Sequence, residues 1–231
     1  MKTILLLVIA FLNATCMNSS VSSNAMSTHE TQVNTINKKT KVDEFRNIQV
    51  AGPLNVVLTK DKRCSVTVEG NSQEALNNLV IYVKDNTLIV TTKGKANNVN
   101  MEQLRINVTA PTIEGLEMAG SGNLSTLSDF TAQKAHMEVT GSGNIILSNP
   151  FTCQQMAVTT TGSGNISVNK LKAKKLITSI TGSGEVNFNN LDVKDAVSEI
   201  TGSGNINLRG KVGSHTKHVT GSGNIDTLGM R

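Results

Sequence analysis

A short glycine-serine motif recurs along the second half of the chain and divides its apolar positions into similar units. Gly-Ser-Gly occurs six times, at spacings of 21, 21, 20, 20 and 19 residues. Asn follows the motif in five copies, and Glu185 replaces it in the other. The first glycines of the copies are Gly120, Gly141, Gly162, Gly182, Gly202 and Gly221. Self-similarity at a fixed period of about 20 residues indicates a solenoid or another repeat architecture.

Apolar and polar residues alternate on both sides of the motif. The position two before each glycine is apolar in most copies, and Thr160 takes it once. The apolar residues after the motif are Ile145 and Leu147, Ile166 and Val168, Val186 and Phe188, and Ile206 and Leu208. A looser apolar column comprises Phe130, Phe151, Leu171, Leu191 and Val212. Alternation with period two is typical of β-strands.

A unit of about 20 residues cannot bury its own apolar face, so its copies must stack. Each strand then pairs in parallel with its counterpart in the next unit. Parallel crossovers are almost always right-handed. The pattern therefore predicts an all-β, single-domain, right-handed parallel β-helix (β-solenoid). Leucine-rich repeats and propeller blades fit the pattern and the period badly.

The Gly-Ser-Gly step is the predicted corner of each coil, because glycine adopts positive φ without steric cost. Stacked corners place equivalent residues about 4.8 Å apart. Amide side chains at that spacing can form a hydrogen-bonded ladder. The predicted structural ladder consists of the five corner glycines from Gly141 to Gly221 and of Asn123, Asn144, Asn165, Asn205 and Asn224. Glu185, within this column, is expected to accept bonds from both neighbours.

Residues 42–112 are more irregular and are interpreted as an N-terminal cap with degenerate coils, in one domain with the regular coils of residues 113–231. The segment from Val50 to Leu58 aligns with that from Val139 to Leu147 as a degenerate copy. Asp85-Asn86 predicts a tight hairpin turn. The last copy stops a few residues after Ile225. This leaves an incomplete final coil whose edge could support self-association.

The N-terminus has the pattern of a targeting segment. Lys2 precedes an apolar run from Ile4 to Leu12, which is too short for a membrane-spanning helix. Residues 1–16 are therefore predicted to be a signal peptide, with cleavage after Cys16 or as late as residue 25. Alternatively, Cys16 is the lipidated first residue of a lipoprotein, although the residues before it match the usual lipobox poorly. Residues 17–41 are interpreted as a flexible polar spacer.

These features predict an exported protein of the periplasm, outer membrane or cell surface, with no transmembrane span in the mature chain. Aromatic residues make up only 3% of the sequence, and the basic residues behind its net charge of +5 are scattered. Nucleic-acid binding is therefore not expected. Cys64 and Cys153 could form a disulfide or remain free thiols, and the sequence does not decide between these.

No catalytic residue, cofactor or metal site is predicted. The glycine motif is not followed by the Lys-Ser/Thr pair of a phosphate-binding loop, and Asn or Ser stands where calcium-binding repeats need Asp. His215 and His218 are interpreted as loop residues, and the lysines at 170, 172, 174 and 175 as a solvated loop. The carboxylates of the repeats are expected in different columns, which disfavours the paired acids of a glycoside hydrolase.

The repeated Gly-Ser-Gly-Asn-Ile units, the signal peptide and the entry strand Phe45–Gly52 resemble the putative auto-transporter adhesin head GIN domain family. The resemblance covers roughly residues 42–228. It implies an exported bacterial protein with a β-helical fold, and it brings no catalytic residues to this chain.

Together, these observations predict a non-enzymatic, adhesin-like protein that binds a glycan or a protein of the envelope or host through polar Thr, Ser and Asn surfaces. Two alternatives stay open at this point. One is a β-helix enzyme that acts on polysaccharide, and the other is a structural or assembly module of the envelope.

Overall fold

The computed structural model describes residues 36–94 and 99–230. These described residues belong to a single compact unit. About 72% of these described residues are strand, with one α-helix among them, and the stacked coils form a β-solenoid of about six turns. The predicted signal peptide, Cys16 and the spacer up to residue 35 lie outside the described residues, so the inferences about them stay predictions.

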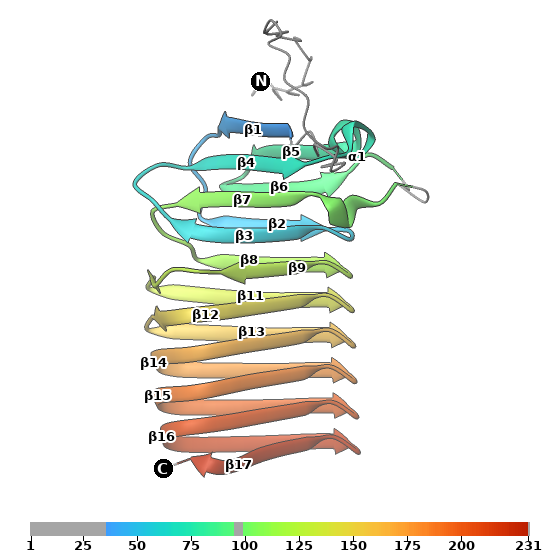
Figure 1. Ribbon diagram of the computed structural model, residues 1–231. Helices are drawn as coiled ribbons and strands as arrows, with labels where there is room; N and C mark the ends of the chain where they lie inside the picture. The colour runs from blue at the N-terminus through green and yellow to red at the C-terminus, as the bar shows by residue number, and fades with distance from the viewer. Residues whose placement is uncertain (1–35, 95–98, 231) are drawn as a thin grey trace, which may run out of the picture. The chain divides into compact units, whose positions relative to one another are not determined.

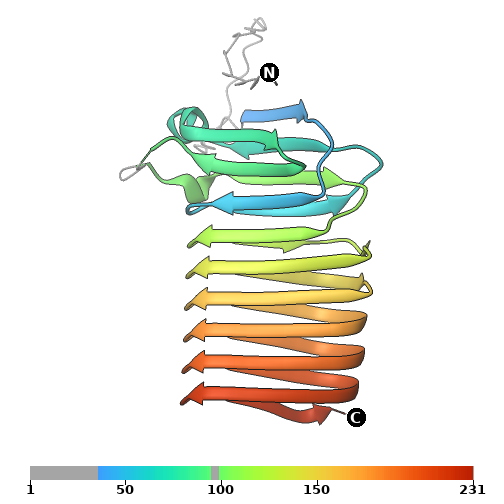
Figure 2. The same ribbon diagram turned by 180° about the vertical axis from the view of Figure 1, so that it is seen from behind.

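Each regular coil has two strand segments joined by the Gly-Ser-Gly corner. Face A is formed by the segments that lead into the corners, and face B by the segments that leave them. Figure 1 shows face B in front, and Figure 2 shows face A. The strands are β8 (Gly115–Gly120), β9 (Asn123–Thr126), β10 (Phe130–Thr131), β11 (Lys134–Gly141), β12 (Asn144–Thr152), β13 (Gln155–Gly162), β14 (Asn165–Gly182), β15 (Glu185–Gly202), β16 (Asn205–Gly221) and β17 (Asn224–Met230).

The coils stack in parallel with equivalent residues of the repeat in register. On face A, Gly141 pairs with Gly162, Gly162 with Gly182 and Gly182 with Gly202. On face B, Ile145 pairs with Ile166 and Ile166 with Val186. The prediction of a parallel solenoid with coils of about 20 residues is therefore confirmed.

The degenerate first coil consists of β2 (Asn47–Ala51) and β3 (Asn55–Lys60). β2 pairs in parallel with β8, so that Val50 lies beside Met118 and in the same column as Val139. The sequence alignment of this coil with the regular repeat is thus correct.

The cap differs from the expected parallel coils. Its elements are β1 (Ile36–Lys41), β4 (Ser65–Gly70), α1 (Gln73–Asn78), β5 (Leu79–Lys84), β6 (Thr87–Thr92), η1 (Met101–Gln103) and β7 (Arg105–Ala110). Three pairs are antiparallel, namely β1 with β4, β4 with β7, and β5 with β6. The chain forms the first coil, runs away from it to build the cap, and returns as β8, so β2 and β3 lie between cap and repeats.

Two local predictions for the cap have different outcomes. The hairpin turn at Asp85-Asn86 is confirmed, because both residues have positive φ (+48° and +63°) between the antiparallel β5 and β6. The spacer was expected to extend to residue 41, but residues 36–41 form β1. This short polar strand is held by main-chain pairing with β4. Its polar composition gives no sign of that pairing.

The interior between the faces is filled by columns of aliphatic side chains. One column on face B runs through Val56, Leu124, Ile145, Ile166, Val186 and Ile206, all at most 1% exposed. Burying a side chain of this size contributes about 1.5–3 kcal/mol. The looser column contains Phe130, Phe151, Leu171 and Leu191 as predicted, but ends in Gly210. Val212 instead pairs with Val193, because the register shifts between Phe188 and Leu191.

A second interior column changes from apolar to polar along the stack. It runs from Met137 through Val158 to Thr178 and Ser198, and ends at Lys217 in β16. The hydroxyls of Thr126, Thr160 and Thr178 are buried and have no hydrogen-bond partner among the described residues. Cys64 and Cys153 are both buried and free, and burial raises the pKa of the Cys153 thiol to about 11.

We expect the change Thr178→Val to raise the free energy of unfolding by about 1 kcal/mol, because it removes a buried, unpaired hydroxyl at nearly constant volume. The reverse change one coil away, Val158→Thr, should lower it by a similar amount. Equilibrium unfolding in urea measures both. A loss of stability in Thr178→Val would show that the hydroxyl has a partner in solution.

Candidate functional site

The Gly-Ser-Gly corners continue the main-chain hydrogen bonding of the strands around the edge of the solenoid. In the five corners after the first, the serine amide donates to the first glycine carbonyl of the preceding coil. The N···O distance is 2.8 Å for Ser163 to Gly141, Ser183 to Gly162 and Ser203 to Gly182. The corner is therefore paired backbone rather than a loose loop.

Glycine is needed at both motif positions, for two different reasons. The first glycines have φ between +111° and +124°, which side chains rarely adopt. A Cβ on Gly182 would also collide with the carbonyl of Gly162. The second glycine has no positive φ, but a Cβ on Gly143 would lie 2.6 Å from Met118 and 2.7 Å from the Gly122 carbonyl. The first position thus permits the turn and the second permits close stacking.

An amide ladder runs along face B beside the corners. Asn165 donates to Asn144 at 3.0 Å, Asn144 to Asn123 at 2.8 Å, and Asn123 to Asn55 at 2.8 Å. All three donors, Nδ2, point toward the cap. Asn55, in the degenerate coil, extends the predicted ladder by one residue and is its last acceptor.

The other end of the ladder departs from the prediction at Glu185. Asn165 Oδ1 accepts from the Glu185 main-chain N–H, and the Glu185 carboxylate accepts from Asn207. It does not bridge its neighbours Asn165 and Asn205, as was expected. Within the described part of the chain, no side-chain hydrogen bond joins Asn205 to Asn224. The carboxylate has no N–H to donate, which interrupts the amide-to-amide series.

Two arrays made mostly of small polar side chains lie on the outside of the coils. The column on face A beside the corners comprises Thr140, Thr161, Thr181, Thr201 and Thr220, all exposed. The second column of face B comprises Ser125, Ile146, Ser167, Asn187, Asn207 and Asp226. Neither these columns nor the ladder column from Asn123 to Asn224 contains a basic residue. They offer hydrogen-bonding groups with little charge.

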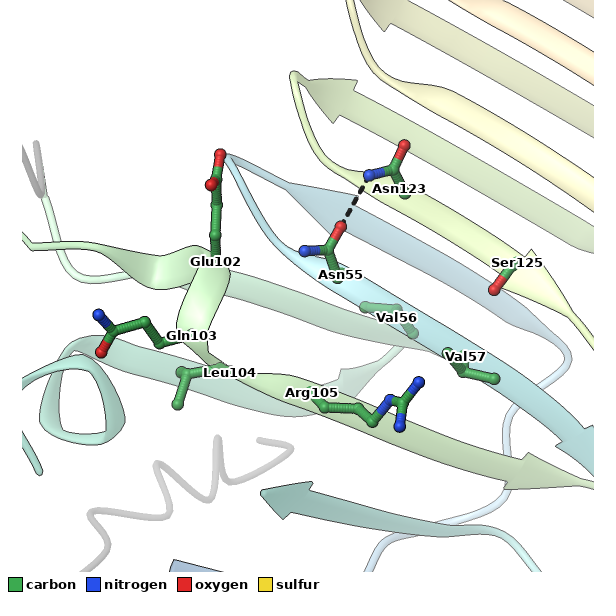
Figure 3. Close-up of a pocket in the computed structure, with 9 residues that line it drawn as sticks. All are labelled: Asn55, Val56, Val57, Glu102, Gln103, Leu104, Arg105, Asn123 and Ser125. Atoms are coloured by element: carbon green, nitrogen blue, oxygen red, sulfur yellow. Dashed lines mark hydrogen bonds between the residues drawn. The ribbon is translucent and has the colours of Figure 1, made fainter. Parts of the chain in front are cut away.

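A groove of about 350 Å³ lies on face B where the cap meets the regular coils. Its lining comes from β3, β7, β9 and η1, as Figure 3 shows. The residues are Asn55, Val56, Val57, Glu102, Gln103, Leu104, Arg105, Asn123 and Ser125. A second hollow of about 240 Å³ shares Asn55, Glu102 and Asn123 and continues toward Pro53 and the first corner. Sequence reasoning missed this site, because η1 is placed there only by the folding of the cap.

The groove gathers polar groups with unused hydrogen-bonding capacity. Arg105 and Asn123 flank Asn55 in the register of β7, β3 and β9. The Glu102 carboxylate and the Arg105 guanidinium are exposed and have no hydrogen-bond or ion-pair partner among the described residues. In Figure 3 the amide nitrogen of Asn55 faces the open side of the groove, toward Glu102.

The other candidate residues do not converge on the groove. His215 lies in an interior column, where its Nε2 is 3.1 Å from Ser198 Oγ, and not in a loop as predicted. Burial, and secondarily the charge of Lys217, lowers its pKa. The expected lysine loop belongs to strand β14, where Lys172 lies 3.8 Å from Asp192 of the next coil. An opposite charge on the neighbouring coil, Asp192 beside Lys172, therefore balances part of the positive charge of this cluster.

The carboxylates are less dispersed than predicted. Glu138 and Glu199 share one column of face A, although different columns were expected. Three coil spacings separate them, or roughly 14 Å, which exceeds the roughly 5–9.5 Å of glycosidase acid pairs. Glu117 lies on the coil next to Glu138 and is bound by Gln49 at 2.9 Å and His136 at 3.2 Å. Among residues 36–94 and 99–230, no group of three or more His, Cys, Asp or Glu side chains is placed to hold a metal.

A two-faced parallel β-solenoid with an antiparallel cap, carrying a polar groove, defines the class of this protein. The family model described as "Putative auto-transporter adhesin, head GIN domain" matches residues 44–230, and the chain belongs to that family. The predicted resemblance is thereby confirmed. No curated protein sequence matches the chain significantly.

Several solved structures have a similar fold. A putative adhesin of Bacteroides fragilis NCTC 9343 superposes with a TM-score of 0.74 at 22% identity, covering 84% of this chain and 96% of that one. A putative adhesin of Parabacteroides distasonis ATCC 8503 superposes with a TM-score of 0.70 at 19% identity, covering 84% of this chain and 97% of that one. A putative lipid binding protein of the same organism has a TM-score of 0.65 at 20% identity, with the same coverage of 84% of this chain and 97% of that one. At these identities the likeness establishes the fold alone.

We expect Gly182→Ala to lower the free energy of unfolding by more than about 2 kcal/mol, since it combines an unfavourable φ with a collision against the preceding coil. Ser183→Ala, in the same corner, is the matched control and should change stability little, because the Ser183 side chain is exposed. Thermal unfolding monitored by circular dichroism compares them. Equal stability of the two variants would contradict the steric account of the corner.

Proposed function

We propose that this protein is exported and acts as a non-enzymatic, adhesin-like protein that binds a glycan at the cell envelope or surface. The observation that carries the proposal is the polar surface of face B, where columns of Asn and Ser repeat from coil to coil. Repeated, weakly charged hydrogen-bonding groups suit a polymer that is itself rich in hydroxyl groups. Each contact is weak, but contacts that act together bind strongly.

Further support comes from the family and from the N-terminal pattern. Membership of an adhesin-like family agrees with a binding role. The charged start and the apolar run from Ile4 to Leu12 support export through a cleaved signal peptide. Among the described residues, no helix has the length and apolar character needed to cross a membrane.

Binding of the purified full chain to immobilised oligosaccharides and to bacterial envelope fractions tests this function. We expect binding without release of new reducing ends. The double variant Asn205→Ala/Asn224→Ala should weaken binding, because it removes exposed face B amides that do not hydrogen-bond to each other in the described structure. The matched double variant Thr161→Val/Thr181→Val on face A should bind like the unmodified protein. Absence of binding to every glycan and fraction would refute the proposal, as would the release of reducing ends.

A further inference from the structure

We propose that the groove beside the cap is a subsite for a single neutral sugar unit, in which Glu102, Asn55 and Arg105 bind the sugar hydroxyls. This inference rests on the proposed glycan-binding function and places the recognition of one sugar unit in this groove. The groove volume of about 350 Å³ lies at the lower end of the roughly 300–1,000 Å³ of small-molecule sites.

The amide ladder directs its donors toward the groove. Each hydrogen bond from Asn165 to Asn55 points its donor toward the cap, so the series ends on Asn55 with its Nδ2 group unused by the ladder. Hydrogen bonds in a chain polarise one another. The terminal Nδ2–H groups of Asn55 are therefore stronger donors than those of an isolated asparagine. The ladder places this donor at the edge of the groove.

The side chains around that donor supply the other groups that a sugar needs. Glu102 provides two carboxylate oxygens that can accept protons from adjacent sugar hydroxyls, and hydrogen bonds to charged groups are the stronger kind. Arg105 provides donors on the next strand, in register with Asn55. Val57, partly exposed two residues after Asn55 on β3, offers an apolar contact for the C–H groups of a sugar ring.

The balance of charges favours a neutral sugar over an acidic one. Glu102 lines both hollows, so a ligand that fills the groove lies close to a negatively charged side chain. An acidic sugar would be attracted by Arg105 but repelled by Glu102. A neutral sugar can accept hydrogen bonds from Arg105 and Asn55 and donate one to Glu102 at the same time. Each side chain then acts as the donor or acceptor that its chemistry allows.

The test compares Glu102→Gln with Glu138→Gln, an equally conservative change at an exposed glutamate of face A. Binding of the full chain to immobilised oligosaccharides is measured by surface plasmon resonance, with neutral ones of glucose, galactose, mannose and N-acetylglucosamine beside acidic ones of uronic acids. Glu102→Gln should weaken binding of the preferred sugar by at least about tenfold, the scale of a lost charge-assisted hydrogen bond. Glu138→Gln should leave it unchanged. Arg105→Gln should also weaken binding and keep the neutral-sugar preference.

The possible outcomes separate this proposal from the function on which it rests. If the unmodified chain binds a neutral oligosaccharide and Glu102→Gln binds equally well, the groove is not the subsite, while the glycan-binding function stands. If only acidic oligosaccharides bind, the assignment to a neutral sugar is wrong. If no oligosaccharide binds, both proposals fail. Circular dichroism spectra that match the unmodified protein show that the variants are folded.

Discussion

The stacking of glycine corners at the spacing of paired strands is the constraint on which the rest of the structure depends. Each corner must turn the chain within three residues and also accept the corner of the next coil in direct main-chain contact. Only glycine satisfies both demands, through positive φ at its first position and the missing Cβ at its second. Because every corner lies in register, every other residue of the coil is placed in a column.

Those columns account for the composition of the chain. Most inward positions hold an aliphatic side chain, which leaves little need for aromatic residues. Outward positions hold small polar residues, whose side chains can pair with those of the coil above or below. The amide ladder on face B results directly, and its end at Asn55 brings it to the groove. The same geometry that stabilises the fold therefore also directs hydrogen-bond donors toward the candidate binding site.

The regular half of this architecture follows from the sequence, whereas the cap does not. Periodicity alone predicts the parallel coils, the corner glycines and most of the amide column, because these depend on nearest-neighbour repetition. The antiparallel pairing of β1, β4 and β7 depends on contacts between segments without internal similarity. Arg105 lies beside Asn55 through the parallel pairing of β3 with β7, two segments that share no repeat, so sequence reasoning could not find the groove. The shift that places Gly210 beside Leu191 follows from a one-residue shortening of the last repeat.

Amide hydrogen exchange at the corners is the most direct test of the central claim. The N–H groups of Ser163, Ser183 and Ser203 are exposed by position yet bound to the carbonyls of the preceding coil, each at 2.8 Å. The account predicts that they exchange as slowly as the amides of the neighbouring strands, because opening a corner requires separating two coils. Rapid exchange at these serines, together with protected strands on both sides, would show that the corners are ordinary loops and would contradict the account.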